Sequence, residues 1–150
     1  MSNAIITTLN DLIETSRDGE NGFRAAAERA QDPQLKSLLL EYAEDCGRAV
    51  RELQQCVTAN GGKPETTGTA AGKAHRGWMK LRAAVTDDDD SAVLNECERG
   101  EDHAKAQYQK ALKADLPGEV RALIQKQFDG ALRHHDRIRE LRDRYAHAAH

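Results

Sequence analysis

The sequence predicts an all-α fold, a bundle of four long helices that form two antiparallel hairpins joined by a long crossover with an extra short helix. Three observations support this. Apolar residues recur in steps of three and four from Ile5 to Tyr145, which is the spacing of a buried helix face. Prolines stand only at positions 33, 64 and 117, between such segments, where they begin or end helices. No segment shows the alternation with period two that is typical of a strand.

The first two helices form the first predicted hairpin. The first runs from about residue 4 to residue 29, and the second begins at Pro33 with Asp32 as its N-cap. The sequence Asn60-Gly61-Gly62 tolerates the left-handed conformation that ends a helix, and Pro64 prevents its continuation. Two long helices joined by so short a turn must lie antiparallel.

The crossover and the second hairpin follow. Residues 65–72 are rich in Thr, Gly and Ala and lead into a short amphipathic segment that ends near Val85. The four aspartates at 87–90 suit a helix start, because carboxylates there accept hydrogen bonds from free N–H groups. The third long helix is thus predicted over about 88–114, and Pro117 opens the last. A crossover between the second and third helices distinguishes ferritin-like bundles from simple up-down bundles.

Composition limits the function classes. A chain of 150 residues is one domain by size, so residues 1–150 are predicted to form a single bundle. Charged residues make up 31% and the formal net charge is −3, and without a long basic run we expect no nucleic-acid partner. No apolar stretch approaches the roughly 20 residues that span a bilayer, so we expect no membrane insertion and a cytoplasmic location. The three cysteines are widely spaced, and we expect free thiols.

Polar residues occupy buried positions near the middle of the long helices. Glu101 is in step with Leu94, Cys97 and Tyr108 on the apolar face of its helix, so it is predicted to point inward. A buried carboxylate is costly unless it is paired or bound to a metal. The predicted polar layer consists of Glu20, Cys46, Glu101 and His134, with Glu98, Gln127 and His135 on its flanks.

A short internal repeat supports this layer. The sequence DGENGF at 18–23 resembles RGEDHA at 99–104, and RAVREL at 48–53 resembles DRIREL at 136–141. The alignment pairs Glu20 with Glu101 and Cys46 with His134. Counted from the two hairpin turns, all four lie at about the same height, as expected if the hairpins are copies.

Four segments carry a resemblance to a known family: DGENGF at 18–23, GKAHRGW at 72–78, ECERGED at 96–102 and HDRIR at 135–139. Over nearly its full length the chain resembles an uncharacterised bacterial family of ferritin-like four-helix bundles. The ferritin-like class implies a di-metal centre with one Glu on each of two helices and a Glu-x-x-His pair on each of the others. The resemblance assigns Glu20 and Glu101 to the single Glu positions, His134 and Cys46 to the His positions, and Ala43 and Ala131 to the bridging Glu positions.

The layer therefore allows two interpretations. In one, the layer is a mononuclear or reduced di-metal site for iron, zinc or manganese, with Glu20, Glu101 and His134 as ligands and Cys46 as a candidate fourth ligand. In the other, the two carboxylates pair with His134, with arginines or with tyrosines in a satisfied polar core.

The matching functions are a non-catalytic or stress-related bundle that associates with a protein partner or a second copy, and alternatively a metal-dependent oxidoreductase or metal-storage protein. His75 and Arg76 beside Trp78 on the crossover form either a patch for an anion or partner, or the surroundings of a Trp that seals the core.

Overall fold

The structure, a computed structural model, describes residues 3–64, 81, 83 and 90–148 and places four long helices in this part of the chain. Their bounds are Asn3–Arg29 for α1, Pro33–Ala59 for α2, Asp90–Leu112 for α4 and Gly118–Ala148 for α5. Within these residues no strand is present. The predicted all-α four-helix bundle is confirmed, and the bounds of these four long helices lie within a few residues of their predicted places.

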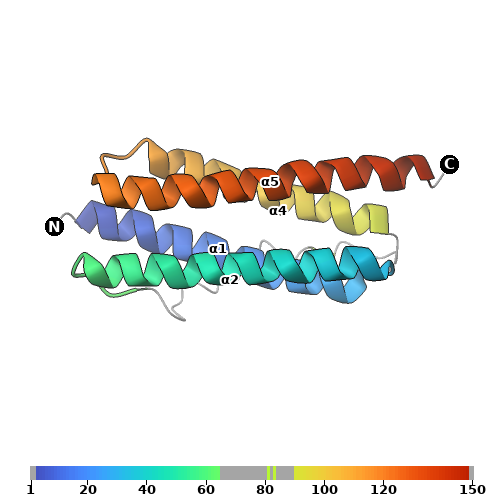
Figure 1. The fold of residues 1–150 in the computed structure, drawn as a ribbon, viewed down its shortest axis with the longest axis horizontal. Coiled ribbons are helices and arrows are strands. Elements are labelled where there is room, and N and C mark those ends of the chain that lie inside the picture. The colour runs from blue at the N-terminus through green and yellow to red at the C-terminus, as the bar shows by residue number, and fades with distance from the viewer. Residues whose placement is uncertain (1–2, 65–80, 82, 84–89, 149–150) are drawn as a thin grey trace.

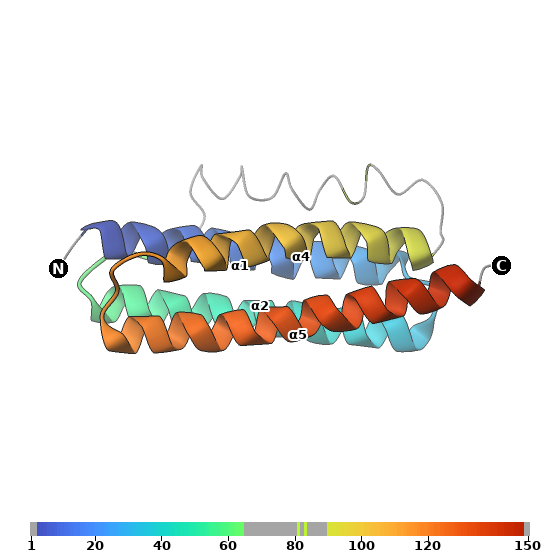
Figure 2. The ribbon, with the colours of Figure 1, turned by 90° about the horizontal axis from the view of Figure 1, so that it is seen from above.

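The helices pack as two hairpins side by side (Figure 1). α1 lies against α2, α4 lies against α5, and α1 also packs on α4. α2 and α5 are neighbours too, but of these four pairs they pack least closely. α2 ends near the N-terminus of the chain and α4 begins at the opposite end of the bundle (Figure 2). The connection between them therefore joins opposite ends of the bundle. The relationship to ferritin-like proteins stays a prediction.

Local sequence explains the helix ends. Asp32 is the N-cap of α2, and its side chain accepts a hydrogen bond of 2.9 Å from the Gln34 N–H, which satisfies a donor that the helix leaves free. At the other end Gly61 has a φ of 83°, a conformation that glycine adopts without the steric penalty of a Cβ.

Asp90 is the last of the four aspartates at 87–90 and makes contacts that its sequence position does not indicate. It begins α4, but its carboxylate also accepts hydrogen bonds of 2.7 and 3.0 Å from the backbone N–H groups of Gln31 and Asp32. These bonds tie the α1–α2 turn to the start of α4 across the end of the bundle.

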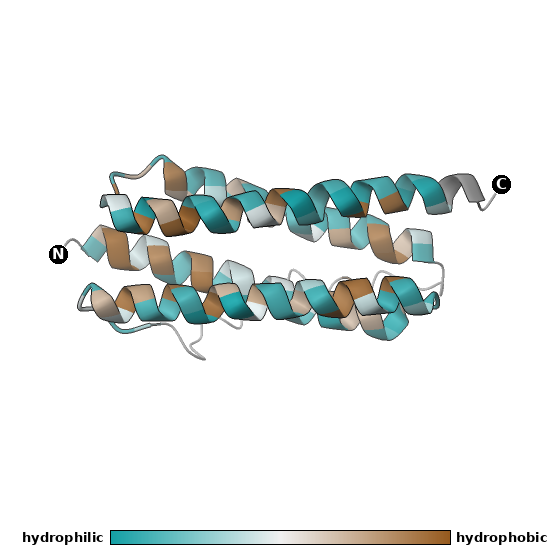
Figure 3. Ribbon diagram, viewed as in Figure 1, coloured by the Kyte–Doolittle hydropathy of each residue, from teal (hydrophilic) through white to brown (hydrophobic). Residues whose placement is uncertain are grey.

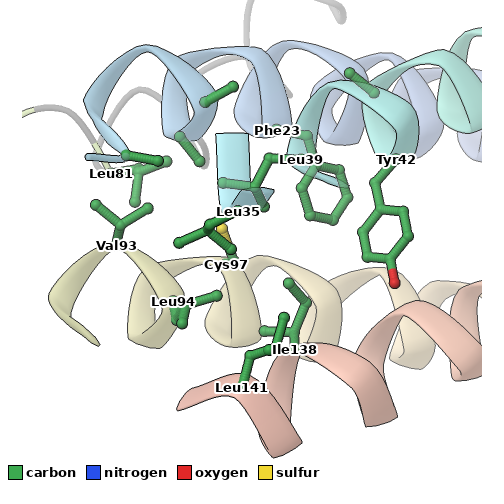
Figure 4. Packing of buried hydrophobic residues seen from close by; sticks show 14 residues of the cluster. Phe23, Leu35, Leu39, Tyr42, Leu81, Val93, Leu94, Cys97, Ile138 and Leu141 are labelled. Carbon is green, nitrogen blue, oxygen red and sulfur yellow. The ribbon is translucent and has the colours of Figure 1, made fainter. Parts of the chain in front are cut away.

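Two apolar clusters form the core, one in each half of the bundle. The cluster near the α1–α2 turn contains Phe23, Leu39 and Ile138 (Figure 4). The cluster at the opposite end contains Leu12, Leu53 and Ile124. The visible faces of α2 and α5 are mostly hydrophilic (Figure 3). Between the clusters the interior is polar, and it is there that the candidate site lies.

Part of the crossover also contributes to the core. Leu81 is only 1% exposed and packs in the cluster with Phe23. His75, Arg76 and Trp78 lie outside the described residues, as does most of the predicted short helix. No helix in the described part of the chain has the length and apolar character required to cross a membrane.

Candidate functional site

A cavity of about 420 Å³ occupies the polar middle of the bundle, between the two apolar clusters. All four helices line it. α1 contributes Thr15, Ser16 and Gly19, and α4 contributes Glu101, Ala104 and Tyr108. The remaining lining residues belong to α2 and α5, from Tyr42 to Glu52 and from Lys126 to His134. Because the exposed residues among these belong to α2 and α5, the mouth lies between those two helices and the floor lies on α1 and α4.

Glu101 is the most unusual group in this floor. The residue is 4% exposed, faces the cavity, and forms no hydrogen bond or ion pair with the described part of the chain. Burial, with a smaller contribution from the charge of neighbouring Asp102, raises the pKa of Glu101 from 4.5 to about 8. The side chain is therefore a neutral carboxylic acid at pH 7, and its O–H and carbonyl oxygen both lack a protein partner. The predicted inward orientation of Glu101 agrees with its burial here.

Tyr108, about two turns after Glu101 on α4, connects α1, α4 and α5. Its hydroxyl donates a hydrogen bond of 2.9 Å to Gln127 Oε1 and lies 3.2 Å from Ser16 Oγ. Since the one phenolic proton is used toward Gln127, Ser16 must be the donor in the second bond. The Ser16 oxygen thus keeps acceptor capacity at the cavity floor. Gln127 extends this hydrogen-bond network to α2, because its amide N–H groups donate to the Ala49 carbonyl at 3.3 Å and to Glu52 Oε1 at 3.1 Å.

His134 lies on the α5 wall, as predicted, but it has a partner. Its Nε2 is 3.0 Å from Asp45 Oδ2 on α2, and its ring stacks on Tyr42 with centroids 3.9 Å apart. Burial lowers the pKa of His134 below 6.5, against the opposing effect of Asp45. Neutral His134 therefore donates from Nε2 to the Asp45 carboxylate and leaves Nδ1 as an acceptor. In Figure 4, Tyr42 stands at the edge of the apolar cluster, with its hydroxyl directed away from α2.

Cys46 lines the α2 side of the cavity. Its Sγ would lie 3.1 Å from a Cβ at Gly19, so the missing side chain on α1 makes room for the thiol. Burial, together with the nearby charges of Glu101, Asp45 and Glu20, raises the pKa of the Cys46 thiol well above its ordinary value. A thiol in this state is a poor nucleophile and a poor metal ligand at neutral pH. All three cysteines are free, as predicted.

Glu20 is not among the residues that line the cavity. Its carboxylate forms an ion pair of 3.1 Å with Arg24, one turn along α1. It also crosses the face of α2 at Gly47, where an added Cβ would lie 2.8 Å from Glu20 Oε2. The glycine therefore holds space between the helices for this carboxylate.

Two of the three flanking candidates also face elsewhere. Glu98 pairs with Arg142 and, at 3.5 Å, with Arg139. His135 is 2% exposed, and its Nε2 lies 2.6 Å from Asp102 Oδ1 on α4. Both contacts join α4 to α5. Of the seven candidates, the structure brings four to the cavity: Cys46, Glu101, Gln127 and His134.

The ligand set of a di-metal centre does not fit these residues. The bridging positions hold Ala43 and Ala131, whose methyl groups cannot bind a metal, and Glu20 is turned toward Arg24. Across the described ranges, no three His, Cys, Asp or Glu side chains are placed so that they could hold one ion.

Ion pairs at the cavity mouth are the part of the site that sequence reasoning missed. Arg48 pairs with Asp45 at 3.1 Å, and Lys126 pairs with Glu52 at 3.6 Å. Exposed Arg133 completes the rim. The spacing of Asp45 and Arg48 on one helix face could have indicated the first pair. The second joins α2 to α5, and nothing in the spacing of either helix indicates it.

Comparison with known proteins places the chain in a family. No curated protein matches the sequence. The model of a family described as a domain of unknown function, DUF2383, matches residues 4–114. The matched residues include Cys46, Glu101 and Tyr108 and end before α5, which supplies Gln127 and His134. The match covers most of the chain, and the protein therefore belongs to the DUF2383 family.

Proposed function

We propose that the protein is a ligand-binding helical bundle, which holds a small polar molecule in its central cavity and has no catalytic role. The observation that carries this is Glu101, a buried carboxyl group that faces the cavity without a protein partner. The Glu101 oxygens are not among the side-chain atoms sealed away from the cavity without a partner. A ligand in the cavity could therefore form hydrogen bonds with them.

The character of the cavity supports binding over catalysis. Its volume of about 420 Å³ falls within the size range of small-molecule sites. The thiol of Cys46 has a raised pKa and is held as a thiol at neutral pH, so a nucleophilic role is disfavoured. His134 is already engaged by Asp45.

The test is a screen of small polar fragments by ¹H–¹⁵N NMR, comparing wild type with Ala131→Leu. Ala131 lines the cavity, so leucine there should fill part of the space and abolish binding. Ala122→Leu is the matched control, because Ala122 lies on the same helix and is exposed. We expect fragment-induced shifts at residues around the cavity in wild type and in the control only. Shifts that are scattered over the surface, or equal in Ala131→Leu, would contradict the proposal.

Metal binding is the second candidate, because Cys46, Glu101 and His134, three of the four predicted ligands, line the same cavity. To hold a single iron, zinc or manganese ion, as an oxidoreductase or a storage protein does, these side chains would have to move closer together, because no three in the described ranges are placed to share one ion. Elemental analysis of protein purified without added metal distinguishes the candidates. Near-stoichiometric metal that is lost in Glu101→Gln would favour this alternative.

Association with a protein partner or a second copy also stays a proposal. Leu40, at 45% exposed, is the one large hydrophobic side chain on the surface of the described residues. Association through the surface of the described residues would therefore depend mainly on polar contacts. Light scattering of the purified protein measures how many copies associate.

A further inference from the structure

We propose that the ligand of this cavity is a small organic cation, an alkylammonium, whose positive charge replaces the proton on Glu101. This inference rests on the proposed function and names the chemical class that the site recognises. The observation behind this inference is that the buried carboxyl group of Glu101 has no positively charged partner among the described residues.

Among the described residues, no basic side chain pairs with Glu101, and α1 adds no titratable group to the cavity lining. The titratable groups around the cavity on α2 are Tyr42, Asp45, Cys46, Arg48 and Glu52, those on α5 are Lys126, Arg133 and His134, and those on α4 are Tyr108 and neighbouring Asp102. Two of the cations, Arg48 and Lys126, pair with acids at the mouth and are 60% and 75% exposed. Arg133 is exposed as well, and His134 is neutral above pH 6.5. Of the residues that the structure describes, those at the buried end of the cavity thus supply a carboxyl group and no positive charge.

The floor offers what an ammonium group needs. An ammonium has three N–H donors and no acceptor. Glu101 can accept one or two of these bonds, and the Ser16 oxygen has free acceptor capacity because its own proton is used toward Tyr108. The rings of Tyr42 and Tyr108 also line the cavity, and aromatic faces attract cations within about 6 Å. The alkyl part of the ligand would lie against Ala104 and Ala131.

Binding would exchange one cation for another. In the free protein at neutral pH, Glu101 holds a proton. When the ammonium enters, the Glu101 O–H bond breaks, the proton passes to solvent, and the carboxylate that remains pairs with the ammonium. The ligand itself keeps all its protons, because the pKa of an aliphatic amine is about 10. Affinity should therefore rise by about tenfold for each pH unit while Glu101 is protonated, and become constant above pH 8.

The same chemistry could come from a metal ion, and the donor set favours the organic cation. A bound metal takes several side-chain ligands at about 2 Å, and no three suitable side chains are so placed in the described residues. An ammonium needs one carboxylate with a few neutral acceptors.

The experiment is an NMR titration of the whole protein with n-butylammonium at pH 6, 7 and 8, with 1-butanol, butyrate and Zn²⁺ as comparison probes. We expect butylammonium to shift resonances around the cavity, with a Kd that falls about tenfold from pH 6 to pH 7 and about fivefold from pH 7 to pH 8. Butanol and butyrate should bind at least about tenfold more weakly. Glu101→Gln keeps the shape of the side chain, yet it should lose both the preference for the cation and the pH dependence.

The possible failures are distinguishable. If butanol or butyrate binds in the cavity as well as butylammonium does, or if Kd does not change with pH, the inference is wrong and the proposed function stands. If Zn²⁺ binds there and butylammonium does not, the inference is wrong and the metal alternative gains. If no probe shifts the cavity residues in wild type, the inference fails, and the fragment screen then decides the proposed function separately.

Discussion

The burial of Glu101 should make the stability of the protein depend strongly on pH. The pKa of this carboxyl group is raised from 4.5 to about 8 in the folded chain, so the folded state binds the proton more tightly than the unfolded state does. The stabilisation from the bound proton is complete below pH 4.5 and is lost as the pH rises to about 8. Replacing Glu101 with Gln removes this loss.

The magnitude follows from the two pKa values. One pKa unit corresponds to about 1.4 kcal/mol, so the interval between 4.5 and about 8 corresponds to roughly 5 kcal/mol. That is comparable to the whole stability of many small domains, which is about 5–15 kcal/mol. Glu101→Gln should match wild type near pH 4 and exceed it increasingly up to pH 8.

The assay is urea denaturation of both proteins at intervals from pH 4 to pH 9, with the difference in unfolding free energy plotted against pH. Glu44→Gln is the control, because Glu44 is an exposed carboxylate on α2. A difference between wild type and Glu101→Gln that stays constant across this range would contradict the raised pKa of Glu101. It would mean that water enters the cavity and hydrates the carboxylate.

Three further variants test the surroundings of the site by the same denaturation assay. Tyr108→Phe removes the hydroxyl that joins Ser16 to Gln127 and should cost about 1–2 kcal/mol; no loss would mean that these bonds do not form. Asp90→Ala leaves two backbone N–H groups of the α1–α2 turn without their acceptor and should lower the free energy of unfolding by about 2 kcal/mol. An unchanged free energy of unfolding would show that the turn is stable without these bonds. Gly130→Ala should add about 1 kcal/mol, since glycine is unfavourable within a helix and the nearest atom to the added Cβ is 3.7 Å away; a loss of stability would contradict the packing described for α5.

The fold could be predicted from the sequence because helix boundaries depend on local chemistry. Asp32 with Pro33 begins α2, and Gly61 follows its end, as expected from capping preferences. The burial of Glu101 could be predicted for a similar reason. Its spacing from Cys97 and Tyr108 places all three on one face of α4, and all three are buried.

The detailed contents of the site could not be predicted, because they depend on how each helix is rotated against its neighbours. Neighbouring positions on a helix point about 100° apart, so His134 faces the cavity and His135 faces Asp102. Glu20 has the spacing of a buried residue, but the space at Gly47 and the charge of Arg24 draw it out of the layer. The spacing of Glu20 and Arg24, one helical turn apart, could have indicated their ion pair. Spacing on α1 contains no information about the space that Gly47 leaves on α2.

The state of the Glu101 side chain is the claim on which the cavity, its proposed function and its cationic ligand all depend. A ¹³C NMR titration of the Glu101 carboxyl carbon, assigned by its absence in Glu101→Gln, measures this state directly. The raised pKa of Glu101 predicts a titration midpoint near 8 in the free protein, and pairing of its carboxylate with an ammonium predicts a lower midpoint when n-butylammonium is present. A midpoint near 4.5 in the free protein would contradict it, because the carboxyl group would then be hydrated or paired.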